Sequence, residues 1–185
     1  HDYKSKLKGL VYPTIDRLTR GLTNRFIAVS DAIQSELVAD GVDANKVTRI
    51  YNSLSLNFPL AGLEEIKSVR DDRASAEIRQ ELGIDSDIPL LITVGRLESV
   101  KNQRMLLDIF ELLKANNISY HGIIAGDGSL REEREALAAD KGLSGQVSFL
   151  GFRTDVYELL QAADIFLLTS TMEGFGITLL EAMAA

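Results

Sequence analysis

The apolar residues of this chain follow two patterns that alternate along its length. Short apolar runs such as 90–94 are separated by stretches in which apolar residues recur every three or four positions. The short runs are typical of strands buried on both faces, and the wider spacing is typical of amphipathic helices. The alternation predicts an α/β fold with a mostly parallel sheet. Strands are expected at about 25–29, 47–51, 90–94, 120–125, 146–150 and 164–168.

Helices are expected between these strands. The clearest covers about 102–116, where apolar residues gather on one face. Another runs to about residue 40, with Ser30 or Asp31 as its N-cap and Gly41 after its end. Further helices are expected at about 129–141, at 155–162 and from Ile177 onward.

The segment 53–73 interrupts this alternation with Ser, Asn, Pro and Gly residues followed by a charged run. We interpret it as a crossing between two domains. Residues 1–52 would then be the end of an N-terminal domain, and 74–185 most of a C-terminal one. His1 is not an initiator residue, and Ala185 falls about two turns into the last expected helix. We therefore expect a fragment that is cut at both ends.

The sequence EGFGITLLE, from Glu173 to Glu181, has the layout of an anion site. Gly174 and Gly176 allow a ligand to approach the backbone closely. A helix that starts near Ile177 would offer free N–H groups and the positive end of its dipole. The two carboxylates would repel a bare phosphate, but carboxylates accept hydrogen bonds well from sugar hydroxyls. The pattern predicts a diphosphate with a sugar ring at each end.

Two cations are expected at the same edge of the sheet. The strand at 90–94 is followed by GRLESVKN, with Arg96 at the end of the strand and Lys101 five residues on. Ligands of open α/β sheets bind outside the carboxyl ends of the strands, where both segments fall. Arg96 and Lys101 would neutralise a diphosphate and stabilise it as a leaving group.

Four segments together resemble the retaining nucleotide-sugar glycosyltransferases of family four, which have the GT-B architecture. They are VGRLESVKN, IIAGDGSL, VSFLGFRTDVYELLQAADIFLLTS and EGFGITLLEAMAA, in this order. The resemblance covers about 26–185 and implies two Rossmann-like, doubly wound parallel-sheet domains. It also implies transfer of a hexose-type sugar from a nucleotide diphosphate donor to an acceptor hydroxyl. The transfer would retain the anomeric configuration and serve glycan, polysaccharide or glycolipid synthesis.

The resemblance also implies roles for individual residues. Arg96 and Lys101 would hold the donor diphosphate, Glu181 the ribose hydroxyls, and Glu173 the transferred sugar. Whether Glu173 is a nucleophile or positions the sugar stays open, and we favour positioning. The other implied donor-binding residues are Gly174, Phe175, Gly176, Ile177 and Thr178 at the turn, Gly151, Phe152 and Arg153 near the nucleobase, and His1. Gly151 to Arg153 could instead form an ordinary turn, and His1 could have no role.

Other kinds of site fit the sequence less well. The loop AGDGS at 125–129 lacks the third glycine of a dinucleotide fingerprint, because Arg131 stands there. No His, Asp and Glu cluster has metal-ligand spacing, and the chain has no cysteine. We expect no metal and no cofactor besides the nucleotide sugar, which is a co-substrate. Two other functions stay open: a nucleotide-sugar epimerase and a non-catalytic nucleotide-sugar binding module.

Charge and composition indicate the partners and the location. The net charge of −7 argues against nucleic-acid binding, so the expected partners are a nucleotide sugar and a carbohydrate or lipid-linked acceptor. Residues 1–25 carry six Lys or Arg against two acids, interleaved with apolar residues. They could lie on an anionic membrane surface or form a solvated helix face. The absence of cysteine fits a cytoplasmic location, at the inner face of the membrane if the basic stretch binds it.

Overall fold

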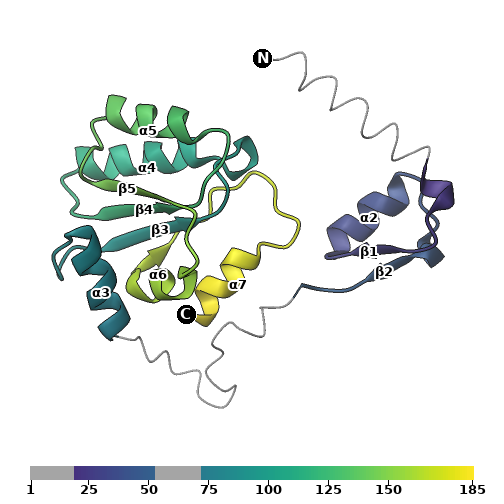
Figure 1. The fold of residues 1–185 in the computed structure, drawn as a ribbon. Helices are drawn as coiled ribbons and strands as arrows, with labels where there is room; N and C mark the ends of the chain where they lie inside the picture. Colours follow the sequence, from purple (N-terminus) through teal and green to yellow (C-terminus); the bar gives the residue numbers. More distant parts are fainter. Residues whose placement is uncertain (1–18, 53–71) are drawn as a thin grey trace. The chain divides into compact units, whose positions relative to one another are not determined.

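The computed structural model of the chain describes residues 19–52 and 72–185. They belong to two compact units, and the division lies after Asn52. Each unit contains parallel strands joined by helices (Figure 1). The predicted α/β class is therefore confirmed. Most of the basic stretch 1–25 and most of the predicted crossing 53–73 lie outside the described residues.

The first unit is a strand, helix and strand. Strands β1 (Phe26–Ala28) and β2 (Val47–Arg49) pair in parallel, and α2 (Asp31–Ala39) connects them. Two single turns, η1 (Arg20–Leu22) and η2 (Ala44–Lys46), precede the strands. The Ser30 hydroxyl accepts a hydrogen bond from the Ile33 N–H at 3.2 Å, so Ser30 is the N-cap. The small core of this unit consists of Ala28, Val42 and Val47.

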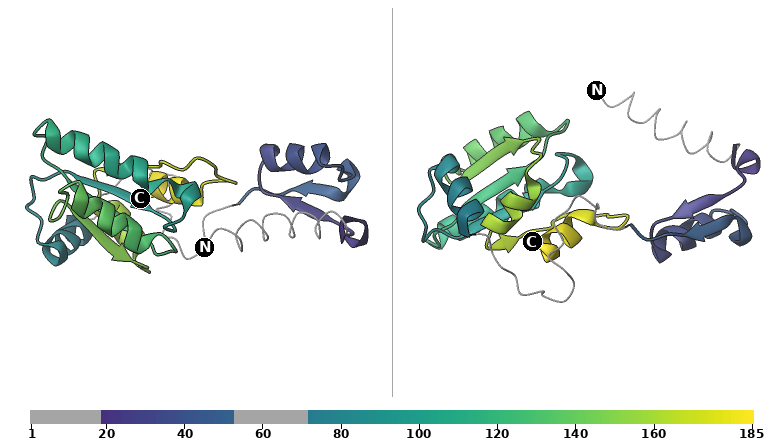
Figure 2. Two further views of the ribbon diagram at one scale, coloured as in Figure 1. Left: turned by 90° about the horizontal axis from the view of Figure 1, so that it is seen from above. Right: turned by 60° about the horizontal axis from the view of Figure 1, so that its bottom comes forward.

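The second unit is a four-stranded parallel sheet with helices on both faces. The strands are β3 (Leu90–Val94), β4 (His121–Ala125), β5 (Val147–Gly151) and β6 (Ile165–Phe166), in the order β5-β4-β3-β6. The helices are α3 (Asp72–Leu82), α4 (Gln103–Ala115), α5 (Arg131–Asp140), α6 (Val156–Ala162) and α7 (Ile177–Ala184). Figures 1 and 2 show α4 and α5 on one face and α3, α6 and α7 on the other.

Two apolar clusters fill the spaces between the sheet and its helices. On one face Leu91 packs with residues of α4 such as Phe110. On the other face Leu90 and Ile92 pack with residues of α3 and α6 such as Ile78. The continuous apolar run of β3 is needed because successive side chains point to opposite, equally buried faces.

The strand order places a topological switch point between β3 and β6. From β3 the chain moves outward through β4 to β5, and then crosses back to place β6 on the other side of β3. In doubly wound sheets the loops on either side of such a point diverge, and ligands bind outside the carboxyl ends of the strands there. The loops after β3 and β6 are the two segments that carry the predicted diphosphate residues.

Helix α3 is the main departure from the predicted elements. The sequence pattern gave no helix at 72–82, because this charged segment has few apolar residues. The helix is instead stabilised by tertiary contacts. Ile78 is buried in the core, and Arg79 donates to the Ile88 carbonyl at 2.7 Å and pairs with Asp164 at 3.1 Å.

Strands β1, β2, β4 and β6 are shorter than predicted, and β6 differs most. Strand β2 ends at Arg49. Strand β6 covers two residues, because it pairs with β3 at those residues and then leaves the sheet. The following loop bonds to another segment, since the Thr171 N–H donates to the Val100 carbonyl at 2.9 Å. The apolar run at 164–168 in the sequence therefore extends beyond the hydrogen-bonded strand β6.

His121 gives the second unit a stability that depends on pH. Its side chain is buried at the start of β4, with Nε2 2.8 Å from the Ser148 hydroxyl, and burial lowers its pKa below the ordinary 6.5. The His121 side chain therefore binds a proton more readily in the unfolded chain than in the folded one. Its effect is to lower the free energy of unfolding as pH drops below the ordinary pKa of 6.5, and it has little effect above that pH. We expect the urea midpoint of the wild type to fall between about pH 7.5 and pH 5.5, and that of His121→Gln to fall less. An equal fall in both proteins would contradict this assignment.

Candidate functional site

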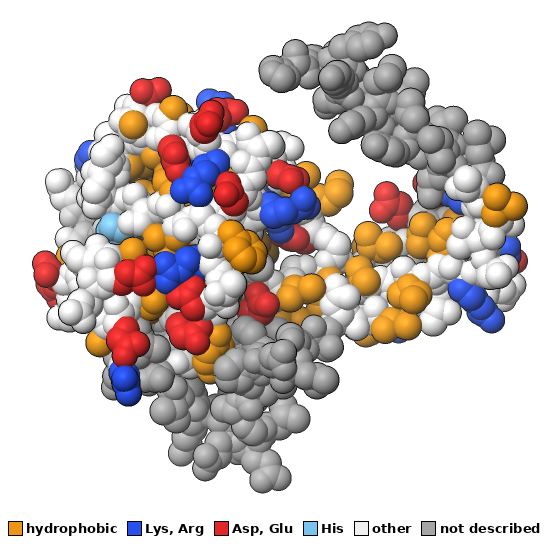
Figure 3. Space-filling view, in the orientation of Figure 1, with side chains coloured by type: hydrophobic (Ala, Val, Ile, Leu, Met, Phe, Trp, Pro, Cys, Tyr) orange, Lys and Arg blue, Asp and Glu red, His pale blue; other side chains and the backbone are white. Residues whose placement is uncertain are grey.

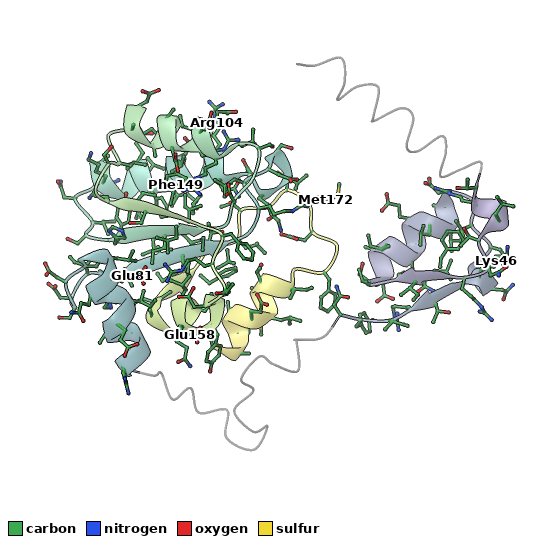
Figure 4. All side chains as sticks on the ribbon, viewed as in Figure 1. Lys46, Glu81, Arg104, Phe149, Glu158 and Met172 are labelled. Atoms are coloured by element: carbon green, nitrogen blue, oxygen red, sulfur yellow. The ribbon has the colours of Figure 1, made fainter. Side chains whose placement is uncertain are left out.

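The loops after β3 and β6 are joined at the switch point. The single turn η3 (Ser99–Lys101) follows β3, and the segment after β6 bonds to it. The Thr169 hydroxyl donates to the Lys101 carbonyl at 3.1 Å, next to the bond between Thr171 and Val100. These bonds place a segment from near the end of the chain beside Lys101. Figure 4 shows this segment, with Met172 labelled, between β6 and α7.

Lys101 and Glu173, two of the predicted catalytic residues, form an ion pair. The Lys101 Nζ lies 2.6 Å from the Glu173 Oε1, and the two side chains are 21% and 25% exposed. Burial alone would raise the pKa of Glu173. Hydrogen bonds from Lys101 and Ser170 outweigh this effect, and the pKa lies below its ordinary value. Glu173 is therefore ionised at neutral pH and cannot serve as a general acid there.

Arg96, the other predicted cation, follows β3 and points into solvent. Its side chain is 74% exposed, and its guanidinium pairs with Glu98 at 2.9 Å. The pair between such exposed groups is weak, so an incoming anion can replace Glu98 at small cost. The Arg96 backbone is held more firmly, since its carbonyl accepts bonds from the Glu98 N–H and from the side chain of Gln103.

The start of α7 has a glycine N-cap and no side-chain cap. Gly176 is the N-cap in a left-handed conformation, with φ of 70°, which favours glycine. Because glycine has no side chain to cap the helix, the N–H groups of Ile177 and Thr178 are not used by an N-cap side chain. Gly174 and Phe175 form the bend that leads from Glu173 into this first turn.

Glu181 lies in α7 one turn beyond this start. Its side chain is partly buried, and burial raises its pKa above the ordinary value. The pKa of Glu173 is shifted in the opposite direction. The two carboxylates of the motif therefore have different environments, one paired with a cation and the other partly desolvated.

A cavity of about 380 Å³ opens beside Arg96, at the ends of β3, β4 and β5. Its volume falls in the usual range for small-molecule sites. Glycine is required at its floor, because a Cβ on Gly126 would lie 2.0 Å from the Gly95 carbonyl oxygen. Phe152 is 80% exposed at the cavity. The lining residues are Val94, Gly95, Arg96, Ala125, Gly126, Asp127, Phe152, Arg153 and Val156.

Arg153 lines this cavity, but its guanidinium is already paired with two carboxylates. Its guanidinium bonds to Glu81 at 2.6 and 3.1 Å and to Asp155 at 2.8 and 2.6 Å. These bonds raise the pKa of Arg153 and lower those of both carboxyl groups. The side chain joins α3 to the start of α6 rather than facing an anion as a free cation. Glu81, labelled in Figure 4, gave no signal in the sequence because α3 itself was not predicted.

Of the remaining predicted site residues, Gly151 and Phe152 lie in the described part of the chain and His1 does not. Gly151, which adopts a φ of 68°, and Phe152 lie at the end of β5, next to the cavity. Among residues 19–52 and 72–185, no three His, Asp or Glu side chains are placed to hold a metal ion. In the same part of the chain, no helix has the length and apolar character needed to cross a membrane.

Comparison with known proteins assigns the chain to a family. The family model for glycosyl transferases group 1 matches residues 74–185, which contain the whole described site. The chain belongs to this family. The predicted GT-B class of fold is likewise confirmed, because the chain is similar to solved structures of such glycosyltransferases.

Three similar proteins illustrate the relationship. The lipopolysaccharide 1,6-galactosyltransferase of Salmonella typhimurium is 28% identical over 162 residues, which are 85% of this chain and 40% of that protein. The N-acetylgalactosamine-N,N'-diacetylbacillosaminyl-diphospho-undecaprenol 4-alpha-N-acetylgalactosaminyltransferase of Campylobacter jejuni is 27% identical over 179 residues, 96% of this chain and 41% of that protein. The structure of Anabaena HepE in complex with UDP and glucose is 29% identical, with a TM-score of 0.74 over 91% of this chain and 45% of that one. This chain spans less than half the length of each.

The ion pair between Lys101 and Glu173 changes what the sequence predicts for ligand binding. From sequence, Glu173→Gln should leave the binding of a nucleoside diphosphate nearly unchanged. The structure indicates tighter binding, by up to about five-fold, because the substitution frees Lys101 from an ion pair worth up to about 1 kcal/mol. Glu181→Gln should weaken binding by on the order of ten-fold or more, since a charged hydrogen bond is lost.

Titration calorimetry with uridine diphosphate tests this pair of expectations. Both variants are measured in the full-length protein at about pH 7.5, which is well above the ordinary carboxyl pKa range. If the two variants exchange their behaviours, the assignment of Glu173 to the sugar and Glu181 to the ribose is reversed. If Glu173→Gln weakens binding, the ion pair is not broken when the ligand binds.

Proposed function

We propose that the full-length protein transfers a hexose-type sugar from a nucleotide diphosphate sugar to an acceptor hydroxyl, and that the second unit binds the donor. One observation carries the proposal. At the switch point, a cation suited to a diphosphate and a carboxylate suited to a sugar lie 2.6 Å apart, beside the start of α7. The family membership of residues 74–185 supports the same class of reaction.

We assign each part of the donor to the side chains whose chemistry suits it. The diphosphate lies at the first turn of α7, where Lys101 and Arg96 replace their carboxylate partners with phosphate oxygens. The ribose hydroxyls bond to Glu181, and the base enters the cavity beside Gly126. The transferred sugar then lies by Glu173, whose released carboxylate accepts hydrogen bonds from its hydroxyls.

In the reaction, the bond between the anomeric carbon and the diphosphate oxygen breaks, and negative charge grows on the diphosphate. Arg96, Lys101 and the N–H groups of α7 stabilise this charge. The acceptor hydroxyl attacks from the face that the diphosphate leaves, and its proton passes to the departing phosphate oxygen. This course retains the anomeric configuration, as in the retaining enzymes of family four. Glu173 stays ionised throughout and positions the sugar.

The proposed donor is a uridine diphosphate sugar. HepE of Anabaena, 28 to 29% identical to this chain, was crystallised with UDP and glucose and with UDP-glucose. The proposed acceptor is a carbohydrate or a lipid-linked sugar, since the named relatives act on lipopolysaccharide and on a diphospho-undecaprenol sugar. The reaction would take place in the cytoplasm, at the membrane if the basic residues 1–25 bind anionic lipid.

Loss of either cation should slow the chemical step. Arg96→Ala and Lys101→Ala are each expected to lower kcat by about 100-fold, as is typical when an electrostatic stabiliser of the leaving group is removed. Lys141→Ala is a matched control, because Lys141 pairs with Asp108 and Glu111 on the outer face of α4 and α5. It should keep wild-type kinetics. Steady-state sugar transfer is the measurement, and wild-type kinetics in both Arg96→Ala and Lys101→Ala would overturn the proposal.

The identity of the donor is tested by thermal unfolding with uridine-, guanosine- and adenosine-diphosphate sugars. A ligand that binds only the native state at 100 times its Kd adds about 2.7 kcal/mol of stability. We expect the uridine series to raise Tm most. A larger shift with either of the other nucleotides would change the proposed base. Transfer of the sugar to an acceptor would separate a transferase from an epimerase and from a binding module.

A further inference from the structure

Gln103, the first residue of α4, is a buried polar residue next to the proposed diphosphate site. Its side chain is 2% exposed, and its Nε2 donates to the Arg96 carbonyl at 2.8 Å. The other end of the amide, Oε1, is buried and has no hydrogen-bond partner among the described residues. Burying an unpaired carbonyl costs free energy. A methionine would fill a similar volume without this cost, so packing alone does not explain an amide at this position.

The bond from Gln103 fixes the backbone from which the Arg96 side chain extends. The Arg96 carbonyl also accepts from the Glu98 N–H at 2.9 Å, so two bonds converge on one oxygen. The next residue, Leu97, is fully buried, and its N–H donates to the Asp127 carbonyl at 2.9 Å. These bonds restrain the backbone at Arg96 and Leu97, whereas the Arg96 side chain is exposed and pairs with Glu98.

The same bond spans the loop that carries both cations. It joins residues seven apart in sequence, from the end of β3 to the start of α4, and Lys101 lies between them. The Lys101 carbonyl is held in a similar way, by the Thr169 hydroxyl at 3.1 Å. Each cation of the proposed site therefore has its main-chain carbonyl bonded to a side chain of another segment.

We propose that Gln103 is a positioning residue for the departing diphosphate, acting through the backbone of Arg96. The inference rests on the proposed function, because it requires that Arg96 stabilise the leaving group. Without the amide, the loop can shift by a fraction of an ångström, and the guanidinium loses its alignment with the charge that develops in the transition state. The effect falls on the chemical step more than on donor binding, since the exposed Arg96 adds little to ground-state affinity.

The test is a double-mutant cycle in the full-length protein with Gln103→Met, Arg96→Ala and the double variant. Gln103→Met is expected to lower kcat by about ten-fold while the donor KM changes by less than about two-fold. In the Arg96→Ala background, Gln103→Met should cause no further loss, because the group it positions is gone. Gln146→Met is the matched control. It removes another amide with a buried Oε1 that has no partner among the described residues, located just before the start of the edge strand β5, and should keep wild-type kcat.

Each outcome separates the inference from the proposed function. Wild-type kinetics in Arg96→Ala would overturn the positioning role, and wild-type kinetics in Lys101→Ala as well would overturn the proposed function. A slowed Arg96→Ala together with a fully active Gln103→Met would overturn the positioning role alone. An equal loss from Gln103→Met in both backgrounds would show that Gln103 acts on the fold in general. If Gln103→Met does not accumulate as folded protein, Gln103→Leu takes its place in the same cycle, and thermal unfolding of each variant is compared with that of Gln146→Met.

Discussion

The placement of β6 beside β3 is the constraint on which the candidate site depends. β3 pairs with β4 over five residues and with β6 over two, all in parallel. From β3 the chain turns to α4 on one face, whereas from β6 it turns to α7 on the other (Figure 1). The two loops lead to helices on opposite faces, yet hydrogen bonds from Thr169 and Thr171 hold them together beside Lys101. Without this crossing, Lys101 and Glu173 would not lie within reach of each other.

Each of three cations at the site is paired with a carboxylate in the structure. Lys101 pairs with Glu173, Arg96 with Glu98, and Arg153 with both Glu81 and Asp155. Figure 3 shows the same close mixture of acidic and basic side chains over the visible face of the second unit. A chain with a net charge of −7 can thus offer local cations to an anion by exchanging one carboxylate partner for another. Arg153, which pairs with two carboxylates, is the least suited to such an exchange, and the exposed Arg96 is the best suited.

Much of the fold followed from the sequence, because buried parallel strands leave a plain apolar signature. The runs at β3 and β4 are of this kind. The Ser30 cap of α2 also followed from a local pattern, that of a helix start. Contacts between distant segments left no such signature. The bond between Lys101 and Glu173 joins residues 72 apart, and α3 depends on tertiary partners rather than on its own pattern. Local composition predicts which residues lie at a strand end, but it does not say which strand ends are neighbours.

The close approach of two loops at the edge of the sheet has a consequence for how this site can diversify. A Cβ on Gly126 would lie 2.0 Å from the Gly95 carbonyl oxygen, and one on Gly128 would lie 2.6 Å from that of Leu97. The loops after β3 and β4 thus touch backbone to backbone, with no side chain between them to absorb a change. Recombination that exchanges one loop between relatives would bring together surfaces that were never fitted to each other. An exchange that preserves this contact must therefore carry both loops together, although α4 and β4 separate them in the sequence.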